Sequence, residues 1–143
     1  MQAVIDTNIV VSRYVYPKGT NAELFDYWRR RKVEVFVSQP ILDEYEQVLK
    51  YPHIQAVHQM GNAQIKQAVA RIRKFSTYVT PLVSIDAVKD DPKDNKFIEC
   101  AYASGANYVV SGDPHLLNLK YYRGITMVSP RMFVEALKQE QVI

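Results

Sequence analysis

The stretch DDPKDNKFIE, residues 90–99, has the composition of a helix start that is also rich in acidic side chains. Asp91 is a predicted N-cap, and Pro92 suits the first helical position because the N–H that it lacks is not needed there. Asp94 follows Asp91 by three residues and would complete a capping box with it.

Asp94 also lies on the apolar stripe of the same helix. Phe97, Ile98 and Ala101 fall three, four and seven positions after it, so these side chains share one face. A carboxylate on a core-facing stripe is costly unless a partner compensates its charge. Two interpretations of this stretch remain open: a capping box alone, or a metal site completed by carboxylates from elsewhere in the chain.

The length and composition indicate an ordinary globular protein. We expect a single domain over residues 1–143, because no repeat or linker divides the chain, and 48% of its residues are hydrophobic and 23% charged. No apolar run could span a membrane, the N-terminus has the pattern of a strand rather than a signal peptide, and the lone Cys100 excludes an internal disulfide. We therefore expect a cytoplasmic protein, and the net charge of +3 weakly favours an anionic partner.

Short apolar runs alternate with amphipathic helical patterns along the chain. The predicted strands cover residues 3–5, 33–37, 78–79, 108–111 and 125–128, and helices are predicted between them, one of them capped by Ser38. This alternation predicts an α/β fold, a three-layer α/β/α sandwich with a central, mainly parallel sheet. In such a sheet the functional crevice lies beyond the C-terminal strand ends, where the strand order reverses.

Four carboxylates are predicted to point toward that crevice. Asp6 directly follows the first strand, and Asp113 follows the strand at 108–111; either alone would be read as a helix cap. Glu44 lies at the margin of the apolar stripe of its helix, and Asp94 is the fourth. Such a group repels itself unless a cation binds, and an oxygen-rich site prefers Mg²⁺ or Mn²⁺. No phosphate-binding loop, dinucleotide fingerprint or nucleophile elbow is present.

These residues resemble the PIN-domain ribonucleases, and most closely the small single-domain, VapC-like toxins of toxin–antitoxin systems. The motifs that carry the resemblance are D-T-N at residues 6–8, the helical Glu44, D-P-K-D-N at residues 91–95, and V-S-G-D at residues 110–113. The resemblance covers nearly the whole chain. It implies metal-dependent endonucleolytic cleavage of RNA without a covalent enzyme intermediate.

The resemblance also implies roles for individual residues. The catalytic and metal-binding cluster would be Asp6, Glu44, Asp94 and Asp113, holding Mg²⁺ or Mn²⁺, with Asn8 and Ser111 as supporting polar residues. Asp91 matches the first acid of the family's D-x-x-D-N stretch, and we interpret it as a cap rather than a ligand. Where many relatives carry a further acid, this chain has His115, which weakens the case for a second metal site. An exposed loop histidine is the favoured interpretation of His115, ahead of a phosphate contact or proton shuttle.

Basic residues could contact RNA, although their pattern is not specific. The candidates are Arg13, Lys18, Lys93, Lys96, His115, Lys120 and Arg123. Tyr121 and Tyr122, between the last two, could stack on unpaired bases. The cluster of Arg71, Arg73 and Lys74 fits a solvated helix face equally well.

The leading hypothesis is a metal-dependent ribonuclease, because four carboxylates are predicted at one rim of the sheet. The alternative is a non-catalytic PIN-fold module that binds RNA or protein, which His115 favours. A receiver domain or haloacid dehalogenase-type phosphatase ranks well behind, because residues 6–8 supply neither an acid pair nor D-x-D. The toxin resemblance implies an antitoxin partner whose basic side chain enters the acidic site. It also implies a homodimer, through the helix of Trp28 or the segment at 54–57.

Overall fold

A six-stranded sheet runs through the centre of the computed structural model, which describes residues 1–141. The strand order is β3-β2-β1-β4-β6-β5, and every neighbouring pair is parallel except β5 with β6. The strands are β1 (Gln2–Ile5), β2 (Glu34–Val37), β3 (Thr77–Tyr78), β4 (Tyr108–Val110), β5 (Tyr121–Tyr122) and β6 (Ile125–Val128). The predicted α/β architecture with a mainly parallel sheet is therefore confirmed.

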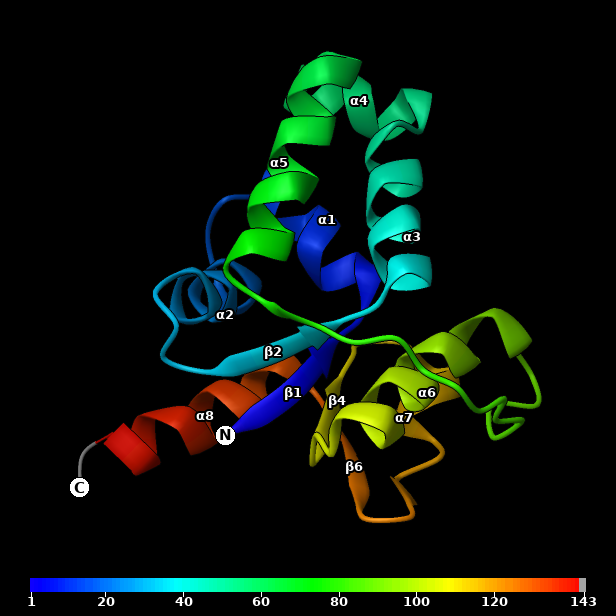
Figure 1. Cartoon of the computed structure of the whole chain (residues 1–143). Coiled ribbons are helices and arrows are strands. Elements are labelled where there is room, and N and C mark those ends of the chain that lie inside the picture. The colour runs from blue at the N-terminus through cyan, green and yellow to red at the C-terminus, as the bar shows by residue number, and fades with distance from the viewer. Residues whose placement is uncertain (142–143) are drawn as a thin grey trace.

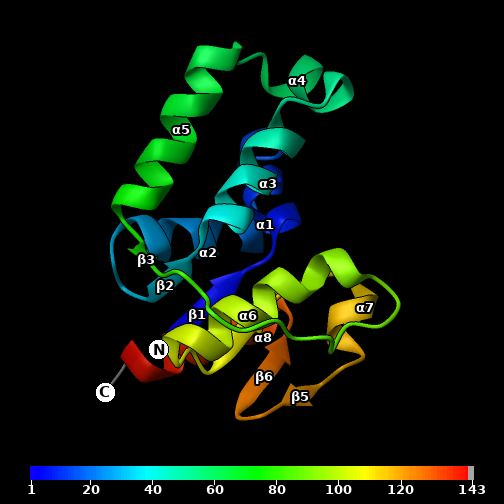
Figure 2. The same ribbon diagram turned by 45° about the vertical axis from the view of Figure 1, so that its right-hand side comes forward.

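Helices cover both faces of this sheet, and three of them extend beyond it. The helices are α1 (Thr7–Val15), α2 (Thr20–Arg29), α3 (Gln39–Leu49), α4 (Pro52–His58), α5 (Asn62–Lys74), α6 (Asn95–Ser104), α7 (Pro114–Leu117) and α8 (Pro130–Gln141). Figure 1 shows α6 in front of the sheet, with α2 and α8 behind it. In Figure 2, α3, α4 and α5 form an arm above the end of β1 that leads into α1.

The strand predictions succeeded where the chain is buried on both sides. In β1, Ala3, Val4 and Ile5 are fully buried, as a parallel strand between two helical layers requires. The edge strand β5 was missed, because two residues beside charged neighbours carry no periodic pattern. It pairs antiparallel with β6 across a tight turn in which Gly124 has a φ of 86°.

Two predicted helix caps, Ser38 and Asp91, occupy the N-cap position but make no side-chain capping bond. Ser38 precedes α3, but its hydroxyl makes no capping bond and has no hydrogen-bond partner among the described residues. Asp91 precedes a 3-10 turn over Pro92–Asp94, and neither it nor Asp94 forms the side-chain bonds of a capping box. The predicted cap at Asp113 is confirmed, since its Oδ1 accepts a hydrogen bond of 2.9 Å from the backbone N–H of His115.

Trp28 belongs to the core and is not available for a dimer interface. Its side chain is fully buried and meets the rings of Phe25, Tyr45 and Phe75 edge-on. Its indole N–H donates to the hydroxyl of Ser76 at 2.8 Å. Leu24 and Phe25, the other apolar residues of this helix that were predicted for a dimer contact, are buried in the core as well. No helix in residues 1–141 is long and apolar enough to cross a membrane.

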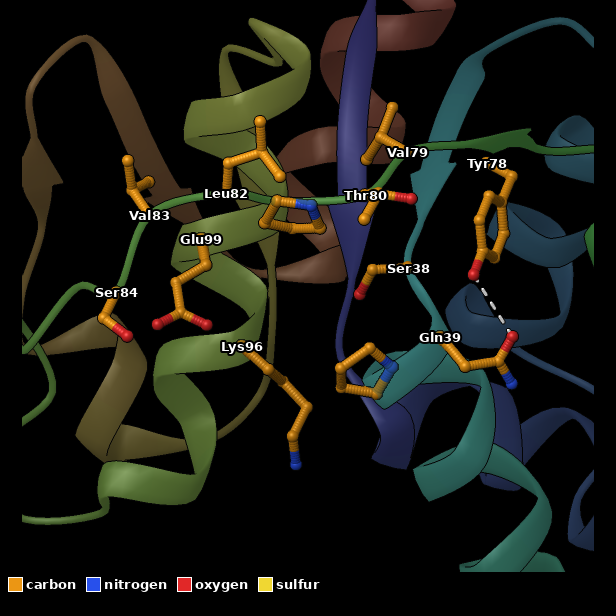
Figure 3. Close-up of a pocket in the computed structure, with 12 residues that line it drawn as sticks. Ser38, Gln39, Tyr78, Val79, Thr80, Leu82, Val83, Ser84, Lys96 and Glu99 are labelled. Carbon is orange, nitrogen blue, oxygen red and sulfur yellow. Dashed lines mark hydrogen bonds between the residues drawn. The ribbon is translucent and has the colours of Figure 1, made fainter.

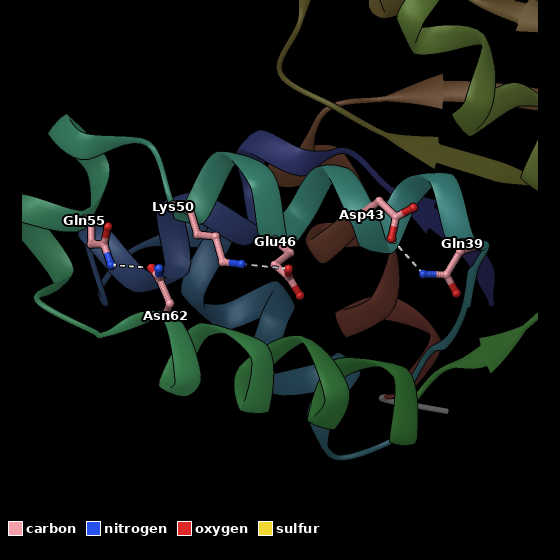
Figure 4. A network of polar contacts seen from close by, with 6 residues as sticks. All are labelled: Gln39, Asp43, Glu46, Lys50, Gln55 and Asn62. Atoms are coloured by element: carbon pink, nitrogen blue, oxygen red, sulfur yellow. Dashed lines mark hydrogen bonds and ion pairs between the residues drawn. The ribbon is translucent and has the colours of Figure 1, made fainter.

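Polar side chains lie along the side of α3 that faces α5, as Figure 4 shows. Gln39 donates to Asp43 at 2.7 Å, and Lys50 pairs with Glu46 at 2.9 Å. Tyr45 of the same helix is fully buried, and its hydroxyl donates to the carbonyl oxygen of Ile5. Tyr45 thus attaches the arm to the end of β1.

Replacing Tyr45 by Phe should lower the free energy of unfolding by about 1–2 kcal/mol, because the buried carbonyl oxygen of Ile5 loses this donor. Urea denaturation monitored by circular dichroism measures the change. Tyr121→Phe is the matched control, since this side chain is 63% exposed and should lose less than about 0.5 kcal/mol. Equal stability of the two variants would show that the Tyr45 bond contributes nothing to the fold.

Candidate functional site

The strand order reverses between β1 and β4, and acidic residues gather at the C-terminal ends of these two strands. From β1 the chain builds outward through β2 to β3, and it later returns to place β4 on the other side of β1. The connections therefore diverge above this pair and leave a crevice between them. Asp6 directly follows β1, and Asp113 lies three residues after β4.

Three carboxylates form the most compact group in the described part of the chain. Oxygen atoms of Asp91, Asp94 and Asp113 all lie within 4.8 Å of one another. Asp94 is buried, while the other two are half-buried. The Oδ2 atom of Asp94 is buried without a hydrogen-bond partner among the described residues. A buried anionic oxygen with no donor is costly, so this arrangement suits a cation.

Asp91 occupies the predicted N-cap position, at the start of the 3-10 turn over Pro92–Asp94, but its side chain makes no capping bond. Its carboxylate instead belongs to the acidic group, where it could act as a ligand. The D-x-x-D-N spacing could have indicated that Asp91 joins the acidic group, because one tight turn places its side chain on the same side as that of Asp94.

Asp6 is held next to this group by Ser111. Ser111 is fully buried; its hydroxyl donates to Asp6 Oδ2 at 2.6 Å and accepts from the backbone N–H of Asp113 at 2.9 Å. One side chain therefore fixes the positions of two carboxylates that follow neighbouring strands. The predicted supporting residue Asn8 is instead exposed on the first turn of α1.

Glu44 is engaged by donors of the protein itself. Its Oε2 accepts from the hydroxyl of Thr7, and its Oε1 pairs with Lys96 Nζ at 2.6 Å. The side chain of Lys96, a predicted phosphate contact, is only 18% exposed and is paired with Glu44 in this structure. The hydrogen bond from Thr7 and the ion pair with Lys96 were not predicted, because both residues lie more than thirty positions from Glu44 in the sequence.

The pKa values of two carboxyls reflect this crowding. Burial raises the pKa of Asp6 from 3.8 to about 6, against the hydrogen bond from Ser111, and the charges of Asp113 and Glu44 raise it further. Burial likewise raises the pKa of Asp94 to about 7, together with the charges of Asp6, Asp91 and Asp113. Both raised pKa values mean that the cluster of carboxylates carries more negative charge than its surroundings stabilise.

The other predicted RNA contacts are scattered over the surface. Lys93 is exposed beside the carboxylates, and His115 is exposed with its Nδ1 4.0 Å from Asp90. Lys120 and Arg123 flank β5 at the edge of the sheet, where β6 lies between this strand and β4. Arg13 lies in the last turn of α1, over the ring of Phe25. The structure does not bring these cations together.

A pocket of about 370 Å³ opens beside Lys96, between the start of α3 and α6. Figure 3 shows Lys96 and Glu99 on α6 facing Ser38 and Gln39 across it, with the segment at residues 79–84 above. Glu99 accepts the backbone N–H of Ile85 at 2.9 Å and so ties this segment to α6. None of the clustered carboxylates lines this pocket, and Lys96 is the residue that it shares with their surroundings.

Comparisons with known proteins agree with this geometry. A family model described as PIN domain matches residues 2–115. The uncharacterized protein MJ1680 of Methanocaldococcus jannaschii is 26% identical over 148 residues, covering 97% of this chain and 93% of that protein. The crystal structure of PAE2754 from Pyrobaculum aerophilum has a TM-score of 0.62 at 12% identity, covering 97% of this chain and 90% of that one. At so low an identity, the structural likeness concerns the fold alone.

Without divalent cations, we expect the free energy of unfolding to fall as the pH rises from about 4 to about 7. The raised pKa values of Asp6 and Asp94 mean that the folded protein keeps protons that the unfolded chain releases in this range. This contribution is therefore greatest below about pH 4 and is lost as the pH passes the folded-state values. Urea unfolding in EDTA at a series of pH values measures the slope.

Asp94→Asn should make this pH dependence shallower, because it removes one of the two titrating groups. Asp86→Asn is the matched control, since its side chain is 72% exposed and lies outside the cluster. A slope that is the same in Asp94→Asn and in the unmodified chain would contradict the assignment.

Proposed function

This chain belongs to the PIN-domain family, and from that membership we propose that it is a divalent-metal-dependent endoribonuclease. PIN domains are generally nucleases, and the acidic group at the strand ends is where such an activity would reside. The observation that carries the proposal is the buried Oδ2 of Asp94, which lies in a group of three carboxylates and has no donor among residues 1–141.

The residues present fit a hard cation. Asp91, Asp94 and Asp113 would hold it, since their oxygens converge and no cysteine or histidine belongs to the group. Mg²⁺ or Mn²⁺ bound there would activate water and neutralise charge on the phosphoryl group during in-line displacement. We propose Asp6, Glu44, Asp94 and Asp113 as the catalytic carboxylates, with Asp91 added as a ligand.

The chain's own donors would keep these carboxylates in place. Ser111 orients Asp6 and the backbone of Asp113, so that both acids face the same point beyond the sheet. Lys96 and Thr7 hold Glu44 at the border of the group, where its charge is partly compensated. A phosphodiester arriving at the crevice would therefore meet a fixed set of oxygens, which lowers the cost of organising them.

We also propose, from the resemblance of the sequence, that the chain acts as one PIN-like domain over residues 1–143 and is the toxin of a toxin–antitoxin pair. The antitoxin would insert a basic side chain among the carboxylates, where two raised pKa values mark uncompensated charge. A homodimer would use the outer arm, where Val57 is 59% exposed.

A non-catalytic module that binds RNA or protein is the second candidate. The pairing of Lys96 with Glu44 favours it, because an internal cation already neutralises one of the acids. The exposed position of His115, where many relatives place another acid, also favours it.

We expect Mn²⁺- or Mg²⁺-dependent cleavage of a mixed pool of single-stranded and structured RNAs, with loss of cleavage in EDTA. Asp94→Asn should reduce the rate by about 100-fold or more, because it removes the buried anionic oxygen that would bind the ion. This variant should remain folded, since it relieves repulsion among like charges. Gel analysis of end-labelled RNA measures the rates.

The matched control is Asp86→Asn, which should cleave like the unmodified chain. Calorimetric titration with Mn²⁺ gives an independent readout of the site. Absence of both cleavage and Mn²⁺ binding would reject the nuclease and favour the non-catalytic module. Mn²⁺ binding that survives unchanged in Asp94→Asn would place the ion elsewhere.

Ser111→Ala should lower kcat by about 10-fold or more, because Asp6 loses the donor that orients it. The KM for RNA should change little, since Ser111 is fully buried and does not reach a substrate. Ser84→Ala, at an exposed position, serves as the control. A purely structural role of Ser111 would instead lower the unfolding midpoint without a specific loss of kcat at temperatures where the variant is folded.

A further inference from the structure

A second cavity, of about 520 Å³, lies between α1, α2 and α5. Five of the side chains that line it are basic, and none is acidic: Arg13, Arg29, Arg31, Arg71 and Lys74. Arg13 and Lys74 are 61 residues apart in the chain, so the fold assembles the group. This cavity is separate from the carboxylate crevice and shares no lining residue with it.

Helix ends explain part of this positive charge. Arg13, Arg29, Arg71 and Lys74 lie in the last turns of three helices, where cations offset a partial negative charge of about one half per helix. Asp26 pairs with Arg29 at 2.6 Å. Against the five cations of this cavity, the three helix ends and Asp26 together leave an excess of about two and a half positive charges. The cavity therefore has more positive charge than is needed to offset the partial negative charges at the C-terminal ends of the three helices.

The cations that remain free of ion pairs face one another across the cavity. Among residues 1–141, no ion pair involves Arg13, Arg71 or Lys74. Arg31 donates to the carbonyl oxygen of Lys74 at 3.2 Å, which fixes its guanidinium without removing its charge. Burial raises the pKa of the phenol of Tyr14, and the charges of Arg13 and Arg71 lower it, so both cations lie near this ring.

Aromatic rings lie among these cations. Phe25 meets Tyr14 and Phe75 edge-on, at centroid distances of 5.9 and 5.8 Å. The guanidinium of Arg13 lies 5.5 Å from the ring centroid of Phe25, so it is held against an apolar surface. Half-buried rings and guanidinium planes together are the surfaces on which unpaired bases stack, while free guanidinium groups bind phosphate.

We propose that this cavity is a second RNA-binding site, which holds a phosphate and an adjoining unpaired base of a single strand away from the carboxylates. This inference rests on the proposed function, in which RNA is the substrate. The carboxylate crevice repels phosphate when no cation is bound, so attraction for the strand has to come from elsewhere on the molecule. Asp6 immediately precedes α1 and Arg13 lies in its last turn, which separates the two sites by about 10 Å along this helix.

An acidic protein segment is the competing occupant. It would satisfy the cations equally well, but it would supply no bases for the half-buried rings of Tyr14 and Phe75. A glutamate peptide of the same charge as the RNA therefore separates the two occupants.

The test compares Arg71→Gln with Lys66→Gln, two variants that remove one positive charge each from exposed positions on α5. Lys66 lies on the side of α5 that faces Asp43 and Glu46, outside the cavity. Binding of a short labelled single-stranded RNA is measured by fluorescence anisotropy in EDTA, over a series of salt concentrations. Arg71→Gln should weaken binding about 5-fold and make the slope of log K against log salt shallower by about 0.7, whereas Lys66→Gln should leave the slope unchanged.

Equal slopes in the two variants, or no binding of RNA by the unmodified chain, would overturn the inference. So would a glutamate peptide that binds as tightly as the RNA and loses as much affinity in Arg71→Gln. Because the assay contains no divalent cation, it is independent of cleavage. If the protein binds RNA through Arg71 but never cuts it, the second RNA-binding site is supported and the nuclease is rejected. If it cuts RNA but the two variants have equal slopes, the nuclease is supported and the second RNA-binding site is rejected.

Discussion

Repulsion among carboxylates at the ends of β1 and β4 is the constraint on which the site depends. The reversal of strand order leaves a crevice there, and the chain places acidic side chains around it from several different segments. Burial makes the repulsion severe, as the raised pKa values of Asp6 and Asp94 indicate. A sheet that ends in a cluster of buried carboxylates is stable only if contacts with the surrounding structure hold each acid in place.

Three sets of side-chain contacts hold the acids in place. Ser111 links the acids that follow the two central strands, and Lys96 joins α6 to α3 through Glu44. Tyr45, the neighbour of Glu44 in the chain, fastens α3 to the last carbonyl of β1. The arm and the sheet are thus connected beside the acids, and a change at any of these side chains would act on the site as well as on the fold.

Much of the fold could be predicted from the sequence because parallel strands buried on both faces appear as short apolar runs. The runs that became β1 and β6 needed no tertiary information, whereas β5 exists only because β6 offers it a free edge. The site was harder. Asp6, Asp94 and Asp113 were recognisable from their position after strands or on an apolar stripe. Asp91 was interpreted as a cap, because a 3-10 turn and a helical start have the same local sequence. The pairing of Lys96 with Glu44 depends on the approach of two helices, which no local pattern encodes.

The two edges of the sheet have a consequence for how copies of this protein can associate. Both edge strands, β3 and β5, are only two residues long. A strand of that length offers too few free backbone groups for another chain to extend the sheet, and such short edges are one way in which proteins resist aggregation. Association between copies is therefore left to helical surfaces.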